Sequence, residues 1–342
     1  MKYKKQYIIP IFIPHLGCNN ECIFCNQRKI SGSQQPVEKQ QVKEIIDKYL
    51  DYFDNKFEKQ IEIAFFGGSF TGIEIEKQIE YLEVVQPYIN NRKIESIRIS
   101  TRPDYINKSN LELLKKYKVK TIELGVQSLD DEILKIAKRG HTVKDVEVAS
   151  KLIKDYGFVL GHQIMVGLPG SDFIKEKNTA EISIAMRPEI VRIYPVLVIA
   201  KTELEEMFNR NEYTPLTLEE AINSATTLYS LYKENNIKVI RTGLHITEEL
   251  AEESNFIAGP MHPAFGQMIQ ARIVRNKIDF EIQQNINSES KKIIIEAPQL
   301  MINYIVGVKR ENIKYFNNKY NIDIYVNINK DLEKDTFKCK VI

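Results

Sequence analysis

The sequence has few cysteines, little net charge and no long apolar run, and each shortage excludes a class of protein. Four cysteines in 342 residues are too few for a disulfide-stabilised secreted scaffold. The net charge of +2 gives no strong field that would attract nucleic acid to the whole surface. No apolar run approaches the length of a membrane-spanning helix, so we expect a soluble, cytoplasmic protein with no membrane partner.

Three of the four cysteines, Cys18, Cys22 and Cys25, lie close together near the N-terminus with the spacing CxxxCxxC. Three thiolates this close can bind one metal centre, and sulfur ligands select iron–sulfur clusters or zinc. Both kinds of centre commonly take four protein ligands, so three leave an open position where chemistry can occur. A structural zinc site usually has two CxxC pairs or a histidine at ligand spacing, and His15 is the only histidine nearby.

Segments with strand-like and helix-like patterns alternate over most of the chain. The expected strands are residues 8–14, 61–66, 96–101, 121–126, 158–168, 190–198 and 239–240. The expected helices are residues 37–53, 73–89, 111–117, 129–137, 143–156, 174–186 and 218–235. Strands separated by helices imply a parallel sheet, so the predicted fold class is α/β, a partial (β/α)6 TIM-like barrel with a small C-terminal α+β domain.

The chemically informative motifs follow the expected strands. The cysteines come after the first strand, Gly67-Gly68-Ser69 after the second, and Thr101-Arg102-Pro103 after the third. In folds built from βα units the site lies on the loops at the carboxyl ends of the strands. The positions of the motifs therefore predict one site at that end of the barrel.

This combination of cysteines and βα units resembles the radical S-adenosylmethionine (SAM) enzymes. The resemblance implies that Cys18, Cys22 and Cys25 hold three irons of a 4Fe–4S cluster, and that SAM chelates the fourth iron. Phe24 stands at the family's aromatic position, which implies packing near the adenine. The implied activity is reductive cleavage of SAM to methionine and a 5′-deoxyadenosyl radical, with the electron coming from a donor such as ferredoxin or flavodoxin.

Further residues match the SAM-binding motifs of the family. Gly67, Gly68 and Ser69 resemble its GGE-type motif, whose backbone receives the methionine amino group. Gln127 and Arg139 resemble the branch that contains the oxygen-independent coproporphyrinogen oxidases. There the glutamine contacts the ribose, and the arginine binds the SAM carboxylate through its planar guanidinium.

Two positions of the expected SAM site depart from that branch. Gln163 stands where the oxidases have an aspartate, and Ser100-Thr101 replaces a carboxylate near the ribose. We still assign Thr101 and Gln163 to the SAM site, because they occupy the matching positions.

A closer resemblance is to the catalytic subunit of the Elongator complex and its bacterial relatives, which modify the wobble uridine of transfer RNA. The matching words are Phe65-Phe66-Gly67-Gly68-Ser69-Phe70-Thr71-Gly72, Ser100-Thr101-Arg102-Pro103-Asp104, Glu123-Leu124-Gly125-Val126-Gln127-Ser128 and Lys138-Arg139-Gly140-His141-Thr142. Those enzymes also carry a C-terminal acetyltransferase domain. No acetyl-CoA loop is visible here, so we expect that domain to be lacking.

We expect residues 1–250 to form the radical SAM core and residues 251–342 a C-terminal α+β extension. The extension reads as a strand (291–296), a helix (298–306), a turn, a helix (311–320) and a strand (322–328). This order resembles a minimal KH-type RNA-binding module, in which a GXXG loop clamps the nucleic-acid backbone. Lys309 and Arg310 lie in the turn and are the predicted RNA contacts, although Arg310 replaces the second glycine.

The sequence is compatible with three functions. The first is modification of the wobble uridine of transfer RNA, which the Elongator words and the KH-like order favour. The second is a radical SAM reaction on a small molecule such as a tetrapyrrole or coenzyme precursor. The third is a non-catalytic cluster that serves as a redox sensor or a structural element. Binding of transfer RNA separates the first two, and failure to cleave SAM would favour the third.

Overall fold

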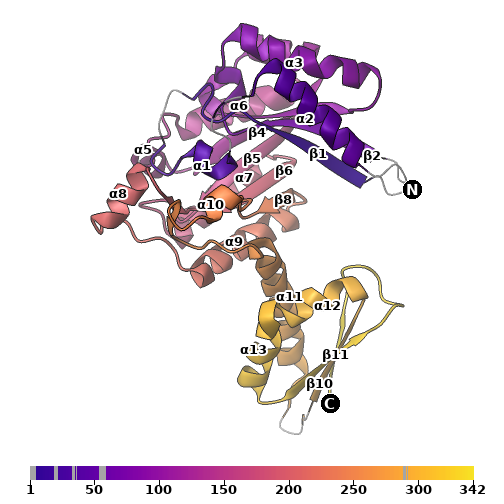
Figure 1. Cartoon of the computed structure of the whole chain (residues 1–342). Helices are drawn as coiled ribbons and strands as arrows, with labels where there is room; N and C mark the ends of the chain where they lie inside the picture. Colours follow the sequence, from indigo (N-terminus) through magenta and orange to yellow (C-terminus); the bar gives the residue numbers. More distant parts are fainter. Residues whose placement is uncertain are drawn as a thin grey trace.

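The computed structural model describes residues 5–18, 22–32, 35, 37–53, 59–287, 290 and 292–342. Its main part is a seven-stranded parallel sheet in the order β1-β2-β3-β4-β5-β6-β8, with helices packed along one side (Figure 1). The strands are β1 (Lys5–Phe12), β2 (Lys59–Phe66), β3 (Ser96–Thr101), β4 (Val119–Gln127), β5 (Val159–Val166), β6 (Ile190–Pro195) and β8 (Lys238–Thr242). The helices between them include α2 (Lys39–Tyr52), α3 (Ile75–Asn90), α4 (Lys108–Lys116), α5 (Asp131–Ile136), α6 (Val143–Asp155), α7 (Phe173–Ala185) and α9 (Leu218–Glu234).

The predicted partial TIM-like barrel is confirmed. Six βα units come before the last strand, β8, which pairs with β6 and forms one edge of the sheet. The other edge strand, β1, does not pair with β8 in the described part of the chain, so the barrel is open. Alternate residues of each strand face the helices; Leu160 and Ile164 of β5, for example, lie in the main apolar core. Gln163, between them, faces the barrel interior.

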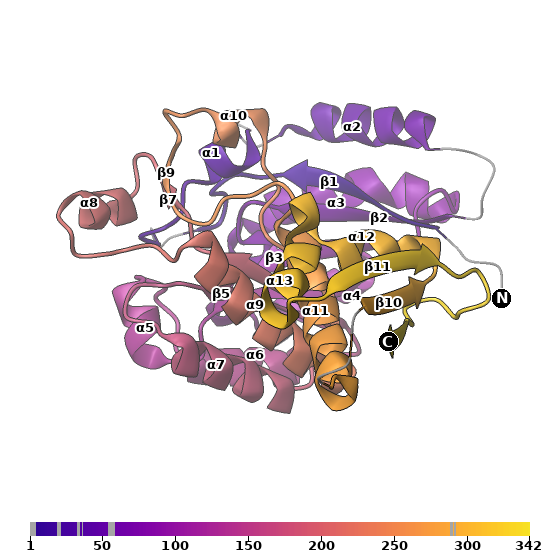
Figure 2. The same ribbon diagram turned by 90° about the horizontal axis from the view of Figure 1, so that it is seen from below.

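Short elements gather at the carboxyl ends of the strands. They are α1 (Gln27–Ser31), α8 (Glu203–Asn209), α10 (Glu248–Ala251) and the two-stranded sheet of β7 (Val198–Ile199) and β9 (Phe256–Ala258). Figure 2 shows them together at the end of the barrel where β1 ends. The sequence did not predict these elements, because each is too short to carry a hydrophobic period.

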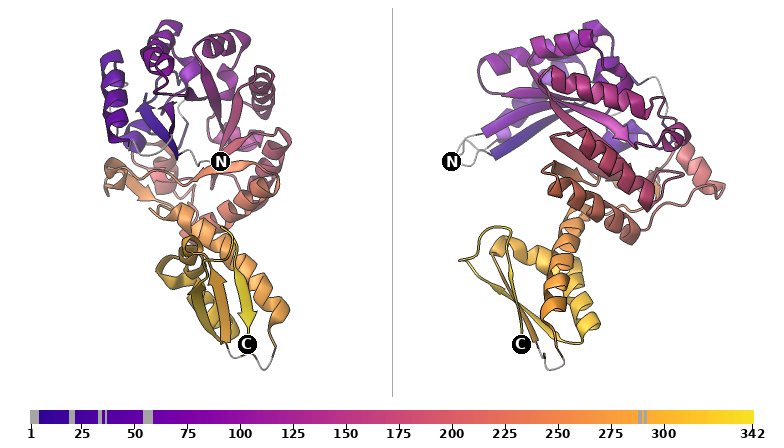
Figure 3. Two further views of the ribbon diagram at one scale, coloured as in Figure 1. Left: turned by 90° about the vertical axis from the view of Figure 1, so that its right-hand side faces the viewer. Right: turned by 180° about the vertical axis from the view of Figure 1, so that it is seen from behind.

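Beyond the barrel, a second sheet of three strands packs against helices (Figure 3). Its elements are α11 (Phe265–Asn285), β10 (Lys292–Ala297), α12 (Ile302–Val306), α13 (Glu311–Tyr320), β11 (Asp323–Ile328) and β12 (Lys338–Val341). Strand β10 is central, parallel to β11 and antiparallel to β12. The expected strand-helix-turn-helix-strand order is present from β10 to β11, while α11 and β12 were not expected. Lys291, the first residue of the expected strand, lies outside the described residues.

Helix α11 connects the two sheets through buried and partly buried charged contacts. The guanidinium of Arg272 is buried and donates to the carboxylate of Glu219 on α9, with both N–O distances 2.8 Å. One turn further on, Arg275 lies over the ring of Tyr315 on α13, 4.3 Å from its centroid. These contacts hold the small sheet beside the barrel. None of the helices that the structure describes is long and apolar enough to cross a membrane.

Candidate active site

The loop after β1 carries the three clustered cysteines. Cys18, Cys22 and Cys25 are all free thiols, and Cys22 is buried. Burial, helped by the neighbouring thiols of Cys22 and Cys18, raises the pKa of Cys25 to about 12. Burial also raises the pKa of Cys18, and Cys22 again contributes. The three thiols are therefore close enough to influence one another, although residues 19–21 between them lie outside the described chain.

The thiols are not arranged as a finished metal site. Among the residues that the structure describes, no group of three His, Cys, Asp or Glu side chains has the geometry to hold a metal ion. Metal binding deprotonates thiols and draws them together. The structure thus places three sulfur ligands in one partly buried loop. Binding of the metal centre would bring the three sulfur atoms together.

The loop after β2 packs backbone to backbone against the cysteine loop. The amide of Ser69 donates to the carbonyl of Leu16 at 2.9 Å, and the thiol of Cys18 lies 3.6 Å from the Ser69 hydroxyl. A Cβ atom on Gly68 would lie 2.4 Å from the Leu16 carbonyl oxygen, and one on Gly17 would lie 2.3 Å from that of Ser69. Glycine is therefore required at Gly17 and Gly68 because the two backbones touch.

Gly67 has a different constraint. Its φ of +89° lies in the region that glycine adopts without strain, and its carbonyl accepts the amide of His15 at 2.9 Å. The Gly67-Gly68-Ser69 motif thus positions the cysteine loop, which is a role that the sequence analysis did not predict for it.

Arg139 connects the cysteine loop to the sheet. One terminal nitrogen donates to the Cys22 sulfur at 2.9 Å, and the other donates to the Gly125 carbonyl of β4 at 2.6 Å. Its Nε is buried and has no hydrogen-bond partner among the described residues. The side chain is 6% exposed, so its charge is held close to the thiols.

Gln127 ends β4 next to Arg139. Its φ of +66° is unusual for a residue other than glycine, and it follows a register shift between β4 and β5. The amide oxygen of Gln127 is buried without a partner in the part of the chain that the structure describes. A strained backbone and an unpaired buried oxygen are both costly, which points to a ligand that donates to this atom.

Two further cationic or polar side chains surround this end of β4. Arg102 is 3% exposed and pairs with Asp104 at 2.9 Å. Burial lowers the pKa of His141 to about 3, with Arg139 and Arg102 acting in the same direction, so the imidazole is neutral. Asp104 already satisfies the guanidinium of Arg102. The buried guanidinium of Arg139 beside the thiols therefore makes this region suited to an anionic group such as a carboxylate.

The other predicted SAM contacts occupy different places. Phe24 is buried in a small apolar cluster with Ile133 of α5 and Leu168, close to Cys22. The hydroxyl of Thr101 is buried and lies 2.7 Å from that of Thr71 in the loop after β2. Thr101 therefore supports that loop, whereas Phe24 fixes the cysteine segment to α5.

A buried charged network crosses the barrel interior, and the sequence analysis missed it. Glu123 is 1% exposed and accepts from Arg98 at 2.8 Å and from Arg192 at 3.0 Å. Arg98 also donates to Glu62 at 2.7 Å. Gln163 joins the network through its amide nitrogen, 3.2 Å from Glu123. Charged residues at inward positions of otherwise apolar strands were the available signal.

The predicted RNA contacts lie at the exposed turn between α12 and α13. Lys309 and Arg310 have φ angles of 51° and 62°. Neither side chain forms an ion pair with a residue in the described ranges, and both are exposed. The adjacent Val308 packs against the main barrel core, so the turn lies beside the barrel.

Two residues outside these sites have structural roles. His262 accepts the amide of Ala264 at 3.0 Å, which makes it a loop-stabilising histidine. Cys339 lies on β12, where burial raises its pKa to about 11 and Glu281 contributes. Cys339 belongs to the apolar core of the small sheet, separate from the cysteine loop.

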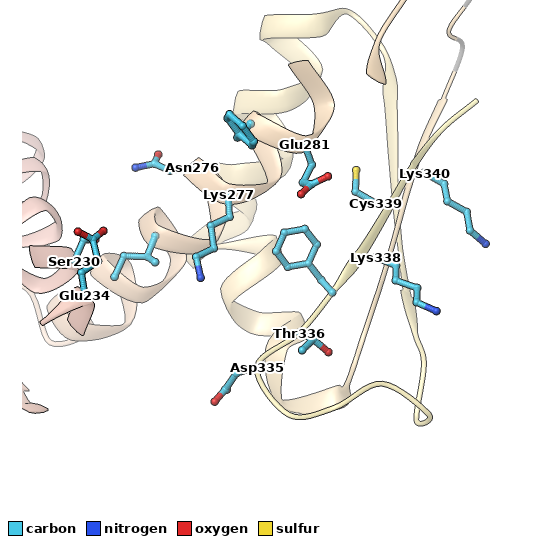
Figure 4. Close-up of a pocket in the computed structure, with 13 residues that line it drawn as sticks. Ser230, Glu234, Asn276, Lys277, Glu281, Asp335, Thr336, Lys338, Cys339 and Lys340 are labelled. Atoms are coloured by element: carbon cyan, nitrogen blue, oxygen red, sulfur yellow. The ribbon is translucent and has the colours of Figure 1, made fainter. Parts of the chain in front are cut away.

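A hollow of about 840 Å³ lies between α9, α11 and β12 (Figure 4). Its charged lining residues are Glu234, Lys277, Glu281, Asp335, Lys338 and Lys340. Three acidic and three basic side chains cancel, so the lining selects neither anions nor cations. Cys339 lines the hollow, but none of the three clustered cysteines and none of the predicted SAM contacts does.

Comparison with known proteins identifies the class. The model of the Radical SAM superfamily matches residues 12–181, and that of the Radical_SAM C-terminal domain matches residues 188–275. An uncharacterised protein of Methanocaldococcus jannaschii is 34% identical over 226 residues, which are 63% of this chain and 69% of that protein. The chain belongs to the radical SAM superfamily and is a radical SAM enzyme, a family that uses a 4Fe–4S cluster and SAM.

Two further relatives refine the position of the chain within the superfamily. A tRNA uridine(34) acetyltransferase of Methanocaldococcus infernus is 36% identical over 183 residues, which are 48% of this chain and 34% of that protein. The structure of an N-terminally truncated Elp3 from the same archaeon matches with a TM-score of 0.62 and 25% identity. That match covers 80% of this chain and 64% of the Elp3 chain. The chain spans about a third of the length of such acetyltransferases.

The residues at the carboxyl ends of the strands fit the family's cofactors. Three thiols influence one another within one loop, as a cluster with one open position requires. The unpaired Gln127 oxygen and Arg139 nitrogen are buried beside them. One is an acceptor and the other a cationic donor, which match the hydroxyl and carboxylate groups of SAM.

Proposed function

We propose that this enzyme cleaves SAM reductively and uses the product to modify the wobble uridine of transfer RNA. The single observation that supports the SAM site best is that buried polar atoms of Gln127 and Arg139, beside the cysteine loop, have no hydrogen-bond partner among the described residues. When bound, the 4Fe–4S cluster supplies the electron that converts SAM to methionine and a 5′-deoxyadenosyl radical. The remaining work of the chain is to bind, orient and shield.

In this proposal Cys18, Cys22 and Cys25 are the three cluster ligands. The Gly67-Gly68-Ser69 loop holds the cysteine loop in place, and its backbone would receive the amino group at the methionine end of SAM. The guanidinium of Arg139 would bind the SAM carboxylate, because its charge is buried and its Nε has no partner among the described residues.

The adenosine end of SAM would lie along the barrel interior. Gln127 and Gln163 offer amide oxygens there, and Phe24 supplies an apolar surface near the cysteines. Thr101 acts indirectly by bonding Thr71 in the loop after β2. Water is excluded by the apolar cluster that surrounds Phe24.

Transfer RNA as the substrate is supported by similarity to proteins named tRNA uridine(34) acetyltransferase and Elongator complex protein 3. We propose that residues 1–250 act as the radical SAM core and residues 251–342 as a KH-like extension that contacts RNA. Lys309 and Arg310 would meet the phosphate backbone, because both are exposed at the turn. We place the enzyme in the cytoplasm, with ferredoxin or flavodoxin as its electron donor.

The test of the proposed substrate is mass spectrometry of transfer-RNA nucleosides from cells with and without the gene. Loss of one modified wobble nucleoside is the expected result, and its mass would name the reaction. Identical nucleoside profiles would contradict the RNA proposal and direct the search to small substrates such as tetrapyrrole or coenzyme precursors.

A further inference from the structure

The amide of Gln163 has a fixed orientation. Its nitrogen lies 3.2 Å from the Ser100 hydroxyl and 3.2 Å from a carboxylate oxygen of Glu123. An amide nitrogen has two hydrogens to donate, so these two acceptors occupy both. The amide oxygen, on the other corner of the same planar group, receives no hydrogen bond from any residue that the structure describes.

Glu123 determines this orientation because it is ionised. Burial alone would raise its pKa, but Arg192 and Arg98 lower the pKa below its ordinary value. If the Gln163 amide were turned over, its oxygen would lie against the carboxylate, with two acceptors facing each other and no proton between them. The ionised carboxylate therefore excludes the reversed amide.

Glu123 itself cannot move away. Arg98 from β3 and Arg192 from β6 both donate to its carboxylate. The neighbouring strand, β5, has a glycine at position 161, where a Cβ atom would lie 2.9 Å from the Glu123 Cγ atom. The carboxylate is thus held by two guanidiniums in a space that a glycine provides.

This arrangement accounts for the two departures from the oxidase branch. At the position of Gln163 those enzymes have an aspartate, which can only accept hydrogen bonds, whereas a free glutamine can donate or accept. Here the nitrogen of Gln163 is engaged, so only its oxygen remains available. Glu123 on β4 and Ser100 together engage that nitrogen, so both departures serve to present the Gln163 oxygen.

We propose that Glu123 is a positioning residue that fixes Gln163 as a hydrogen-bond acceptor for a ribose hydroxyl of SAM. The inference rests on the proposed SAM site and adds to it a residue that touches Gln163 rather than the ligand. It predicts that removing the charge of Glu123 allows the amide to turn and weakens binding of the adenosyl group.

The test uses anaerobic calorimetry on the cluster-loaded protein with S-adenosylhomocysteine, which has no sulfonium to cleave. Glu123→Gln should weaken binding about tenfold, the effect of losing one well-placed hydrogen bond. Gln163→Glu should weaken it by a similar factor, because two carboxylates then face each other. The exchanged pair, E123Q with Q163E, should restore binding to within about threefold, since the acceptor again faces the ligand.

Two controls separate positioning from loss of structure. Glu62→Gln removes a carboxylate that contacts Arg98 but not Gln163, so it should change thermal stability and leave the dissociation constant unchanged. The 2′-deoxy and 3′-deoxy forms of S-adenosylhomocysteine identify the hydroxyl. Wild type should bind one of these deoxy forms about tenfold more weakly than it binds S-adenosylhomocysteine. E123Q should bind that deoxy form and S-adenosylhomocysteine with equal affinity.

The outcomes are distinct. Unchanged binding by E123Q, or no recovery in the exchanged pair, would overturn the proposal. If E123Q does not fold, Gln163→Glu decides, because it sets a second carboxylate against that of Glu123; unchanged affinity in that variant would overturn the proposal. If wild type binds no S-adenosylhomocysteine at all, the proposed function itself fails.

Discussion

Charged side chains are buried in the loops at the carboxyl ends of the strands, whereas they are exposed at the turn between α12 and α13. At the strand ends, the Arg139 guanidinium is buried beside the cysteines, and its Nε and the Gln127 oxygen have no partner among the described residues. At the turn, Lys309 and Arg310 are exposed. Burying polar groups without partners at the strand ends lowers the stability of the fold, whereas exposing charged groups at the turn costs almost no stability.

The two regions therefore differ in how strongly their energetics favour a bound ligand. A buried polar atom without a partner costs about 1–3 kcal/mol, so a fold retains several in one place only where a ligand satisfies them. An exposed lysine or arginine costs little and is common on any surface. The SAM site is therefore supported by energetics, while the RNA contact at the turn is supported by chemistry and similarity alone.

The largest expected effect comes from the cysteines. Replacing Cys18, Cys22 or Cys25 by serine should abolish binding of the 4Fe–4S cluster, because each supplies one of only three thiolates in the loop. Iron and sulfide analysis after anaerobic reconstitution checks this. Cys339→Ser is the matched control and should retain the full cluster; loss of iron in that variant would contradict the assignment.

A smaller effect should follow from Gly68→Ala. The new Cβ atom would collide with the carbonyl oxygens of Leu16 and Ile13, at 2.4 and 2.6 Å, and displace the cysteine loop. We expect a stability loss on the order of 2 kcal/mol and reduced iron content. Gly157→Ala is the control: its φ of +81° makes alanine strained there, but nothing lies within 4 Å of the new Cβ atom, so the variant should lose stability without losing iron. Equal iron content in both variants would argue against a positioning role for Gly68.

The charged network of the barrel predicts a pH dependence. The pKa of Glu123 is lower in the folded protein than its ordinary value of 4.5, because Arg192 and Arg98 outweigh the opposing effect of burial. Its contribution to stability is complete above pH 4.5 and is lost as the pH falls through the lowered pKa. Thermal unfolding of wild type and E123Q should therefore differ less at acidic pH than at pH 7. A gap that widens on acidification would contradict this.

The smallest expected effect is at the exposed turn. Lys309→Ala with Arg310→Ala should weaken binding of transfer RNA about threefold at low salt, and the difference should shrink as salt is added. Filter binding or fluorescence anisotropy measures it. The double variant of Lys43 and Lys48, two exposed lysines on α2, is the control and should bind like wild type. An equal loss in both double variants would show that the turn has no special role.

Much of the barrel could be predicted from sequence, because strands of β-branched residues alternate with helices that carry one apolar face. Helix α11 escaped prediction for a physical reason. Its first part, with Met268 and Ile269, packs on the barrel core, while Ile278 and Ile282 pack on the core of the small sheet. The apolar side changes along the helix, so no single stripe marks it.

The candidate site was partly predictable. The cysteines and Arg139 come from motifs with fixed spacing, and the structure places Arg139 in contact with Cys22. The role of Gly68 in loop packing and the link from Glu123 to Gln163 depend on contacts between strands far apart in sequence. No local pattern reports such contacts, so they emerge only once the strands are in register.

The most direct test of the central claim is an anaerobic assay of SAM cleavage with the reconstituted protein and a chemical reductant. Wild type should release 5′-deoxyadenosine and methionine, while the serine variants of Cys18, Cys22 and Cys25 should release neither. A wild-type protein that binds its full complement of iron yet forms no 5′-deoxyadenosine would contradict the account and favour a sensor or structural cluster.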